Sequence, residues 1–283
     1  IFDKPRFKSL PGLIKSAPAF VKELRSRRFD LALDLQGLFK SAAIAFLSGA
    51  PQRYVYCNAR EYSHLLAKQV CGSHTNGHIV EQYLDVVRKL GANITKGEWA
   101  IYPSEQEKQA AENVAGQAGL SFAKPYVLFA PGANWPNKRW PVHNFSALAD
   151  WLAERNIQTV IIGGPGDSQL AEEIMSGAHS APVSIVGQTS LKQLAHLISN
   201  ANALVGGDTG PMHLAAALRT PVVALMGPTD ANRNGPYGQP DNALATTYEC
   251  HGCWKRSCQK GSDCLSGIST YSVQVVLQRI LQV

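Results

Sequence analysis

One stretch of this 283-residue chain decides the expected fold: Gly206-Gly207-Asp208-Thr209-Gly210-Pro211-Met212-His213-Leu214-Ala215-Ala216-Ala217. It follows an apolar run at 203–205, typical of a buried strand, and it opens an apolar helix. Asp208 or Thr209 is suited to cap that helix, and Pro211 suits its first turn. Free N–H groups at a helix start, together with the helix dipole, form an anion site suited to a diphosphate. The stretch therefore predicts a strand–turn–helix unit that binds an anion.

Outward from this unit, apolar runs and helix-period segments alternate along the whole chain. The expected strands are 29–35, 53–56, 126–130, 159–162, 183–186, 203–205 and 221–226. The expected helices are 37–47, 78–90, 104–118, 144–155, 169–175, 191–199 and 211–218. Strands that are apolar almost throughout indicate parallel sheets buried on both faces, whose ligands bind at the carboxyl ends of the strands.

A break in this pattern at 120–125 is expected to be a linker between two halves. The sequence thus predicts an α/β protein of two doubly wound, Rossmann-like domains, 1–120 and 121–283, facing each other across a cleft. The first half lacks the opening strand and glycine-containing turn of a complete unit. We therefore expect the natural chain to begin before Ile1.

Composition excludes several classes of protein. Hydrophobic residues make up 45% and charged residues 17%, which excludes a disordered chain, and no apolar run reaches the roughly 18 residues of a membrane span. The net charge is +6, and the stretch from Lys4 to Arg28 holds eight Lys and Arg residues against Glu23 alone. This stretch indicates either a solvated helix face or a surface for an anionic partner.

The six cysteines fall into two groups. Cys57 and Cys71 are separate, whereas Cys250, Cys253, Cys258 and Cys264 form a C-x2-C-x4-C-x5-C cluster. The cluster begins like a zinc knuckle but lacks a second C-x2-C, so metal binding, packed thiols and disulfides all stay open. No secretory leader opens the sequence, and a reducing cytoplasm is the expected compartment.

Two further loops follow expected strands of the second half. Residues 131–141 contain two tryptophans, three prolines and the adjacent cations Lys138 and Arg139, which suit a charge clamp on phosphate. Asp167, after the glycines of 163–166, is placed to accept hydrogen bonds from a ribose. Because the chain has no P-loop, no G-x-G-x-x-G after a strand and no D-x-D pair, Lys138, Arg139 and the helix start are expected to carry the diphosphate charge.

Taken together, these motifs resemble glycosyltransferase family 9, whose best-known members are ADP-heptose:lipopolysaccharide heptosyltransferases. The resemblance rests on Pro131-Gly-Ala, Lys138-Arg-Trp-Pro141, Gly163-Gly, Gly187-Gln-Thr-Ser-Leu191, Asp208 to Ala217, and Gly227-Pro-Thr229, with Asp30 to Ser41 and Asn58-Ala-Arg-Glu61 in the first half. It covers nearly the whole chain, and the motifs occur in the order of the family.

The resemblance implies a GT-B fold with an acceptor domain followed by a nucleotide-sugar domain. It implies an inverting, metal-independent transfer of heptose from ADP-heptose to the inner core of lipopolysaccharide, without a cofactor, by an enzyme at the cytoplasmic face of the inner membrane. The partners are the donor and an anionic glycolipid acceptor, not nucleic acid. The catalytic base of the family is an aspartate in the turn after the first strand, and no residue of this sequence matches it. Asp34 is expected to be a strand end.

By position in these motifs, the resemblance also assigns roles to single residues. Lys138 would stabilise the departing diphosphate, and Asp208 would order its turn or contact the donor. The other donor-binding residues would be Arg139, Asp167, Thr209, Gly210, Pro211, Met212 and His213. The anionic acceptor would meet Arg6, Lys8, Lys40 and Arg60.

Two alternatives remain. A GT-B enzyme could use another nucleotide sugar for transfer or epimerisation. A non-enzymatic module could instead dock its basic stretch on a membrane or a nucleic acid, with the cysteine cluster as a zinc-binding knob.

Overall fold

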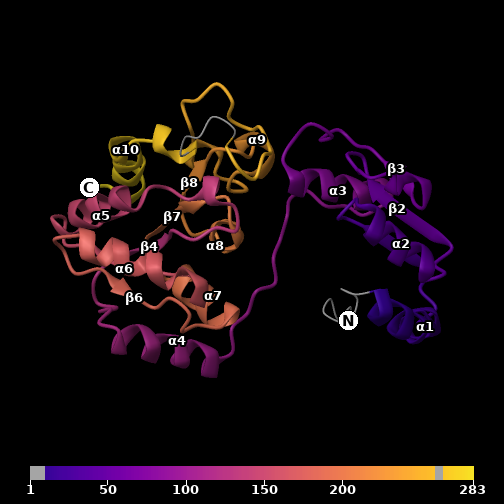
Figure 1. Ribbon diagram of the computed structural model, residues 1–283, viewed down its shortest axis with the longest axis horizontal. Coiled ribbons are helices and arrows are strands. Elements are labelled where there is room, and N and C mark those ends of the chain that lie inside the picture. The colour runs from indigo at the N-terminus through magenta and orange to yellow at the C-terminus, as the bar shows by residue number, and fades with distance from the viewer. Residues whose placement is uncertain (1–9, 259–263) are drawn as a thin grey trace. The chain divides into compact units, whose positions relative to one another are not determined.

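The computed structural model describes residues 10–258 and 264–283 and divides into two compact units, Ile1–Gly97 and Glu98–Val283 (Figure 1). The candidate acceptor residues Arg6 and Lys8 lie outside the described residues. Within the described residues, no helix combines the length and apolar character that crossing a bilayer requires.

The first unit is built on a small parallel sheet. Its elements are α1 (Leu10–Ser26), β1 (Leu31–Asp34), α2 (Phe39–Leu47), β2 (Gln52–Tyr56), the 3₁₀ turn Ser63–Leu65, β3 (Lys68–Val70) and α3 (Ile79–Lys89). The sheet order is β1-β2-β3, and α3 packs Val86 into a core with Val55 and Tyr56. The carboxyl ends of β1 and β2 lie at one edge, because Asp34 pairs in register with Val55.

Strand β1 departs from the expectation that every strand is buried on both faces. Leu31 and Leu33 are 41% and 37% exposed, and β1 is an edge strand of the described sheet. The expectation that strand 29–35 is buried on both faces is therefore wrong. An apolar run predicts a strand, but it does not predict which elements pack against that strand.

A disulfide bond also joins two loops of the first unit. Cys57, directly after β2, is bonded to Cys71, directly after β3. In the sequence these two cysteines lie 14 residues apart, and no motif links them. The pairing of β2 with β3 brings their carboxyl ends together, and the bond fastens the two loops that leave them.

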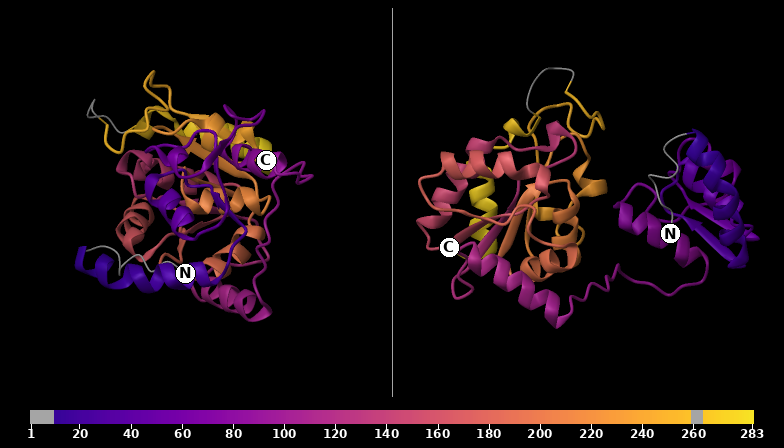
Figure 2. Two further views of the ribbon diagram at one scale, coloured as in Figure 1. Left: turned by 90° about the vertical axis from the view of Figure 1, so that its right-hand side faces the viewer. Right: turned by 60° about the horizontal axis from the view of Figure 1, so that its bottom comes forward.

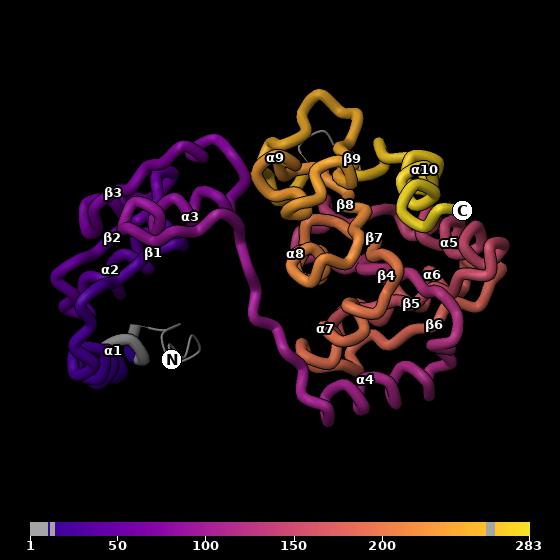
Figure 3. The backbone as a smooth tube through the Cα atoms, turned by 180° about the vertical axis from the view of Figure 1, so that it is seen from behind, coloured from indigo at the N-terminus to yellow at the C-terminus, as the bar shows by residue number. Residues whose placement is uncertain are grey.

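The second unit holds a six-stranded, fully parallel sheet in the order β6-β5-β4-β7-β8-β9 (Figures 1 and 3). Its strands are β4 (Tyr126–Ala130), β5 (Gln158–Ile161), β6 (Val183–Ser184), β7 (Ala203–Gly207), β8 (Val222–Met226) and β9 (Ala243–Ala245). Its helices are α4 (Glu105–Gln117), α5 (Val142–Ala153), α6 (Ser168–Gly177), α7 (Leu191–Ser199), α8 (Gly210–Ala217), α9 (Ala231–Asn234) and α10 (Thr270–Leu281), with 3₁₀ turns at Pro136–Lys138, Pro165–Asp167, Pro240–Asn242 and Cys264–Gly267.

This strand order places a topological switch point between β4 and β7. From β4 the chain builds outward through β5 and β6 on one side, and then through β7, β8 and β9 on the other. In doubly wound sheets, ligands bind outside the carboxyl ends of the strands at such a switch point. The loop with Lys138 and the turn with Asp208 follow β4 and β7.

Both faces of this sheet are buried, as the apolar strands predict. Along β4, Val127 and Phe129 face one core, with α5 and α10, while Leu128 and Ala130 face the other, with α7 and α8. This alternation is the period of a strand, and it makes every residue of β4 buried.

Helix α4 belongs to the second unit. Its Ala111 and Ala115 are fully buried in the core that contains Leu128. The division therefore falls after Gly97 and differs from the boundary expected at residue 120, because the packing of α4 outweighs the loop signal that follows it.

The C-terminal helix α10 and the short strand β9 were not expected from the sequence. Figure 2 (right) shows α10, in yellow, lying along the sheet. Its Val273 and Leu277 are fully buried, and the preceding turn is fixed by Trp140, whose indole Nε1 donates to the carbonyl of Ile268 at 2.9 Å.

We expect the substitution Trp140→Phe to lower the free energy of unfolding by about 1–3 kcal/mol, because it leaves the Ile268 carbonyl without its buried donor. Urea unfolding followed by circular dichroism measures this loss. The control Trp99→Phe changes a residue that is 39% exposed, and its effect should be small. Equal stability of both variants would contradict the anchoring role of Trp140.

Candidate functional site

The turn after β7 opens helix α8 as the sequence predicts. Thr209 is the N-cap residue, with extended φ and ψ angles of −143° and 169°, and its side chain makes no capping hydrogen bond. Helix α8 begins at Gly210, with Pro211 in the first turn. Because no side chain caps this end, the first backbone N–H groups are left to bind a ligand.

Three expected donor-site residues meet at this turn. Lys138 Nζ lies 2.6 Å from Asp208 Oδ2, and His213 Nε2 lies 2.8 Å from Asp208 Oδ1. Lys138 also donates to the backbone carbonyl of Asp208 at 3.3 Å. The Asp208 side chain is 5% exposed, whereas the His213 side chain is 42% exposed. Asp208 therefore holds one cation and one imidazole at the mouth of the turn.

The ion pair with Asp208 differs from what the sequence predicts for Lys138. A free ammonium was expected to face the diphosphate, but in the structure its charge is balanced by a buried carboxylate. Since a carboxylate only accepts hydrogen bonds, the proton of His213 lies on Nε2 and its Nδ1 is the outer atom.

The environment of Asp208 keeps its carboxylate ionised. Burial alone raises the pKa of Asp208, but hydrogen bonds from His213 and Lys138, with the positive charge of Lys138, outweigh burial and lower this pKa from 3.8 to about 2. The pairing of Asp208 is therefore intact at neutral pH.

Two glycines allow the loop after β4 to approach this turn. A Cβ on Gly207 would collide with the backbone carbonyl oxygen of Lys138, and one on Gly206 would lie 2.9 Å from the carbonyl oxygen of Ala130. Arg139 Nε donates to the Ala133 carbonyl at 3.0 Å, which closes the loop on itself. For this steric reason, a side chain does not fit at either glycine at the end of β7.

Asp167 lies at the carboxyl end of β5, beside this loop. Its Oδ2 accepts from the backbone N–H of Gly164 at 2.9 Å, and its carboxylate packs against Gly132 and Gly163. One carboxylate oxygen therefore closes its own turn. Its contact with a ribose stays a prediction.

Residues after β9, which sequence reasoning did not place in the site, cover the carboxyl end of β8. Gly252 N–H donates to the Gly227 carbonyl at 2.8 Å, and Trp254 N–H donates to the Pro228 carbonyl at 2.7 Å. The side chain of the buried Cys264 packs against Gly227. No motif pointed to this contact, because only the fold brings 250–256 to the strand ends.

The cysteines of the cluster, Cys250, Cys253, Cys258 and Cys264, are thiols and not disulfides. Burial, with the charges of the other three cysteines, raises the pKa of Cys264 to about 11. Among residues 10–258 and 264–283, no group of three or more His, Cys, Asp or Glu side chains is arranged to hold a metal ion.

In the first unit, Lys40 and Arg60 are both exposed near the carboxyl ends of β1 and β2. The backbone N–H of Arg60 donates to the Gly37 carbonyl at 2.7 Å, which fixes its loop beside the start of α2. Asp34 ends β1, as expected, and its Oδ1 accepts from the backbone of Gly37 at 2.9 Å.

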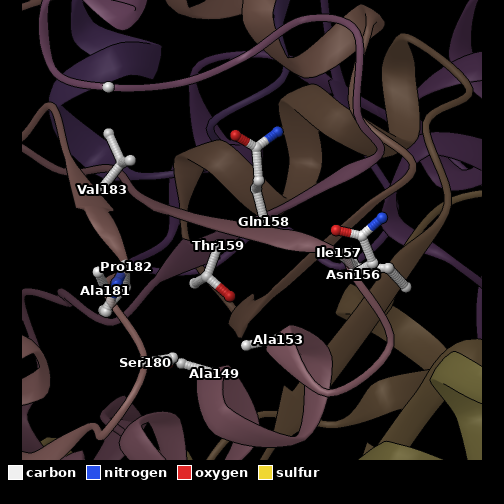
Figure 4. Close-up of a pocket in the computed structure, with 11 residues that line it drawn as sticks. Ala149, Ala153, Asn156, Ile157, Gln158, Thr159, Ser180, Ala181, Pro182 and Val183 are labelled. Carbon is white, nitrogen blue, oxygen red and sulfur yellow. The ribbon is translucent and has the colours of Figure 1, made fainter.

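A separate pocket of about 190 Å³ lies at the opposite ends of the strands in the second unit (Figure 4). It is lined by Gln158 and Val183, the first residues of β5 and β6, and by Ala149 and Ala153 of α5. Since all the expected donor residues follow carboxyl ends, this pocket is not the candidate site.

Comparison with known proteins finds relatives in the family that the motifs resemble. The family model described as glycosyltransferase family 9 (heptosyltransferase) matches residues 18–262. The chain is 29% identical over 268 residues to lipopolysaccharide heptosyltransferase 2 of Escherichia coli, covering 92% of this chain and 75% of that protein. It is 33% identical to lipopolysaccharide heptosyltransferase 1 of Pseudomonas aeruginosa, covering 84% of this chain and 66% of that protein.

Solved structures give the same result for the fold. The structure of E. coli ADP-heptose lipopolysaccharide heptosyltransferase II has a TM-score of 0.73 at 27% identity, covering 95% of this chain and 81% of that chain. A glycosyl transferase family 9 structure from Veillonella parvula has a TM-score of 0.81 at 24% identity, covering 98% of this chain and 80% of that chain.

We expect the contribution of Asp208 to stability to depend on pH. Because its pKa is about 2 when folded and 3.8 as a free group, its stabilising effect is complete above about pH 4 and is lost as the pH falls toward 2. The difference in unfolding free energy between the wild type and Asp208→Asn should shrink by roughly 2 kcal/mol over this range. Urea titrations at each pH measure it, and a constant difference would contradict the assignment.

Proposed function

The chain belongs to glycosyltransferase family 9 and has the GT-B fold, and from that premise we propose that it is an inverting, metal-independent lipopolysaccharide heptosyltransferase that uses ADP-heptose. The names of two relatives point to lipopolysaccharide, and the acceptor that we propose is its inner core. Family membership makes the protein a glycosyltransferase, which argues against a non-enzymatic docking module.

The observation that carries this proposal is the hydrogen-bonded group of Lys138, Asp208 and His213 beside the uncapped start of α8. It lies at the switch point between β4 and β7, where ligands of doubly wound sheets bind. A diphosphate there meets an ammonium, an imidazole and backbone N–H groups, so the charge of a departing nucleoside diphosphate is stabilised without a metal ion.

In the proposed reaction, a hydroxyl oxygen of the acceptor attacks the anomeric carbon of the heptose. The bond from this carbon to the diphosphate breaks, and its electron pair moves onto the diphosphate oxygen. Lys138 and the start of α8 stabilise that growing negative charge, while Asp208 keeps Lys138 in place. Attack opposite the leaving group inverts the anomeric carbon. The hydroxyl proton passes to a base that we assign to no residue of this chain.

His213 would contact the nucleotide sugar in this proposal. Its Nε2–H donates to Asp208, which holds the imidazole beside the start of α8. Asp167 would hold the ribose through the oxygen that does not close its turn.

The first unit would bind the anionic acceptor. Lys40 and Arg60 are exposed at the carboxyl end of its sheet, and Lys15, Lys22 and Arg25 are exposed on α1. We infer that these cations attract the phosphorylated glycolipid and hold the enzyme at the cytoplasmic face of the inner membrane.

We expect Lys138→Ala to lower kcat about 10²- to 10³-fold, because a preorganised cation acts most on the charge that develops at the leaving oxygen. Release of ADP from ADP-heptose and a matched core acceptor measures this effect. Lys138→Arg should recover only part of the rate, since a planar guanidinium does not replace a compact ammonium.

Because Lys138→Ala also leaves Asp208 buried without its cation, a control must separate stability from catalysis. The double variant Lys138→Ala/Asp208→Asn removes the unpaired charge and should regain stability without regaining kcat. The matched control is Lys108→Ala, which breaks an exposed ion pair with Glu105 on α4 and should leave kcat unchanged. A near-normal kcat in Lys138→Ala would show that other groups stabilise the negative charge of the leaving diphosphate.

We expect the rate of transfer to be unchanged by excess EDTA, because side chains and N–H groups meet the diphosphate. Proton NMR of the product should show inversion at the anomeric carbon of the transferred sugar. A rate lost with EDTA and restored by Mg²⁺, or a retained configuration, would overturn the proposed mechanism. A screen of other nucleotide sugars tests the alternative donor.

A further inference from the structure

The segment 250–256 is fastened to the loops of the candidate site at three points. Two are the backbone hydrogen bonds from Gly252 to Gly227 and from Trp254 to Pro228. The third joins it to the other side of the site, where Asn137 Nδ2 donates to the Lys255 carbonyl at 2.7 Å. Asn137 is only 8% exposed, and this hydrogen bond is partly buried. The segment thus connects the loop after β8 with the loop after β4.

The backbone of this segment is held in a sparsely populated conformation next to the third point. Trp254 adopts a left-handed φ of 59°, and its ring lies 5.2 Å from the guanidinium of Arg233 on α9. A non-glycine residue in this region costs free energy that the surrounding contacts must offset. The contacts therefore fix where the next residues, Lys255 and Arg256, lie.

Arg256 is brought against the same ring as the site lysine. Its guanidinium carbon lies 5.6 Å from the centre of the Trp135 ring, and Lys138 Nζ lies 4.6 Å from that centre. Both are within the range of a cation–π contact. The two positive charges are therefore no farther apart than these two distances together.

The charges of the site are not equally available to a ligand. Lys138 is paired with Asp208, and Arg139 Nε is engaged with the Ala133 carbonyl. Arg256 is exposed and forms no ion pair with any residue in the described parts of the chain. Beside the Lys138–Asp208 pair, it is thus a cation whose charge no acidic side chain among residues 10–258 and 264–283 balances.

We propose that Arg256 binds the diphosphate of the nucleotide sugar as a second cation, positioned by Trp135 and by the hydrogen bond between Asn137 and the Lys255 backbone. This inference rests on the proposed function and assigns one of its phosphate contacts. The guanidinium fork is suited to two phosphate oxygens at once, whereas Lys138 acts as a point charge. Cys250 and Cys253 then lie in the segment that carries this contact.

Isothermal titration calorimetry with ADP and with adenosine tests this proposal, because only ADP carries the diphosphate. Arg256→Gln should weaken ADP binding about tenfold and leave adenosine binding within about twofold. Arg256→Lys should recover part of the ADP affinity. The control Arg155→Gln changes an arginine stacked at 4.0 Å on Trp151, away from the site, and should bind ADP like the wild type.

The outcomes separate this inference from the proposed function. Wild-type protein that binds ADP, with unchanged binding by Arg256→Gln, would overturn the role of Arg256 alone. An equal loss of ADP and adenosine affinity would also overturn it, because that result indicates a displaced segment rather than a lost phosphate contact. Wild-type protein that binds no ADP would overturn the proposed donor and this inference together.

Discussion

The buried carboxylate of Asp208 is the constraint on which the site of the second unit depends. It is almost inaccessible to water and remains ionised because Lys138 and His213 both bind it. A buried charge of this kind is tolerated only when its partners are fixed. The neighbouring strands β4 and β7 provide that fixed frame, and the glycine pair at the end of β7 lets the Lys138 loop come close enough. The ion pair therefore depends both on the order of the strands and on the glycines of the turn.

Much of the second unit could be predicted from the sequence because its strands are short apolar runs between glycine and proline residues. The bounds of β4 and α7 agree with the expected 126–130 and 191–199. The three-residue strands β3 and β9 were not predicted, since so short a run carries no period. Helix α10 follows the cysteine-rich segment and was overlooked. The exposure of β1 could not be predicted, because an apolar pattern does not state which neighbour covers it.

The residues of the candidate site were easier to predict than their contacts. The rule that ligands bind at the carboxyl ends of parallel strands selected Lys138, Asp208 and His213. The rule does not tell which of them form an ion pair, since Lys138 and Asp208 are far apart in the chain and meet only through the pairing of β4 with β7. The bond between Cys57 and Cys71 and the place of Arg256 likewise depend on tertiary structure.

Lys138, Asp208, His213 and Trp135 all belong to the second unit, so the contacts that join them are made within it. Nothing in the geometry of this network therefore requires a particular first unit. In evolutionary terms the two halves are separable modules: the second can keep this network while the first diverges. Gene fusions that exchange the first 97 residues between relatives would follow the natural seam of the molecule.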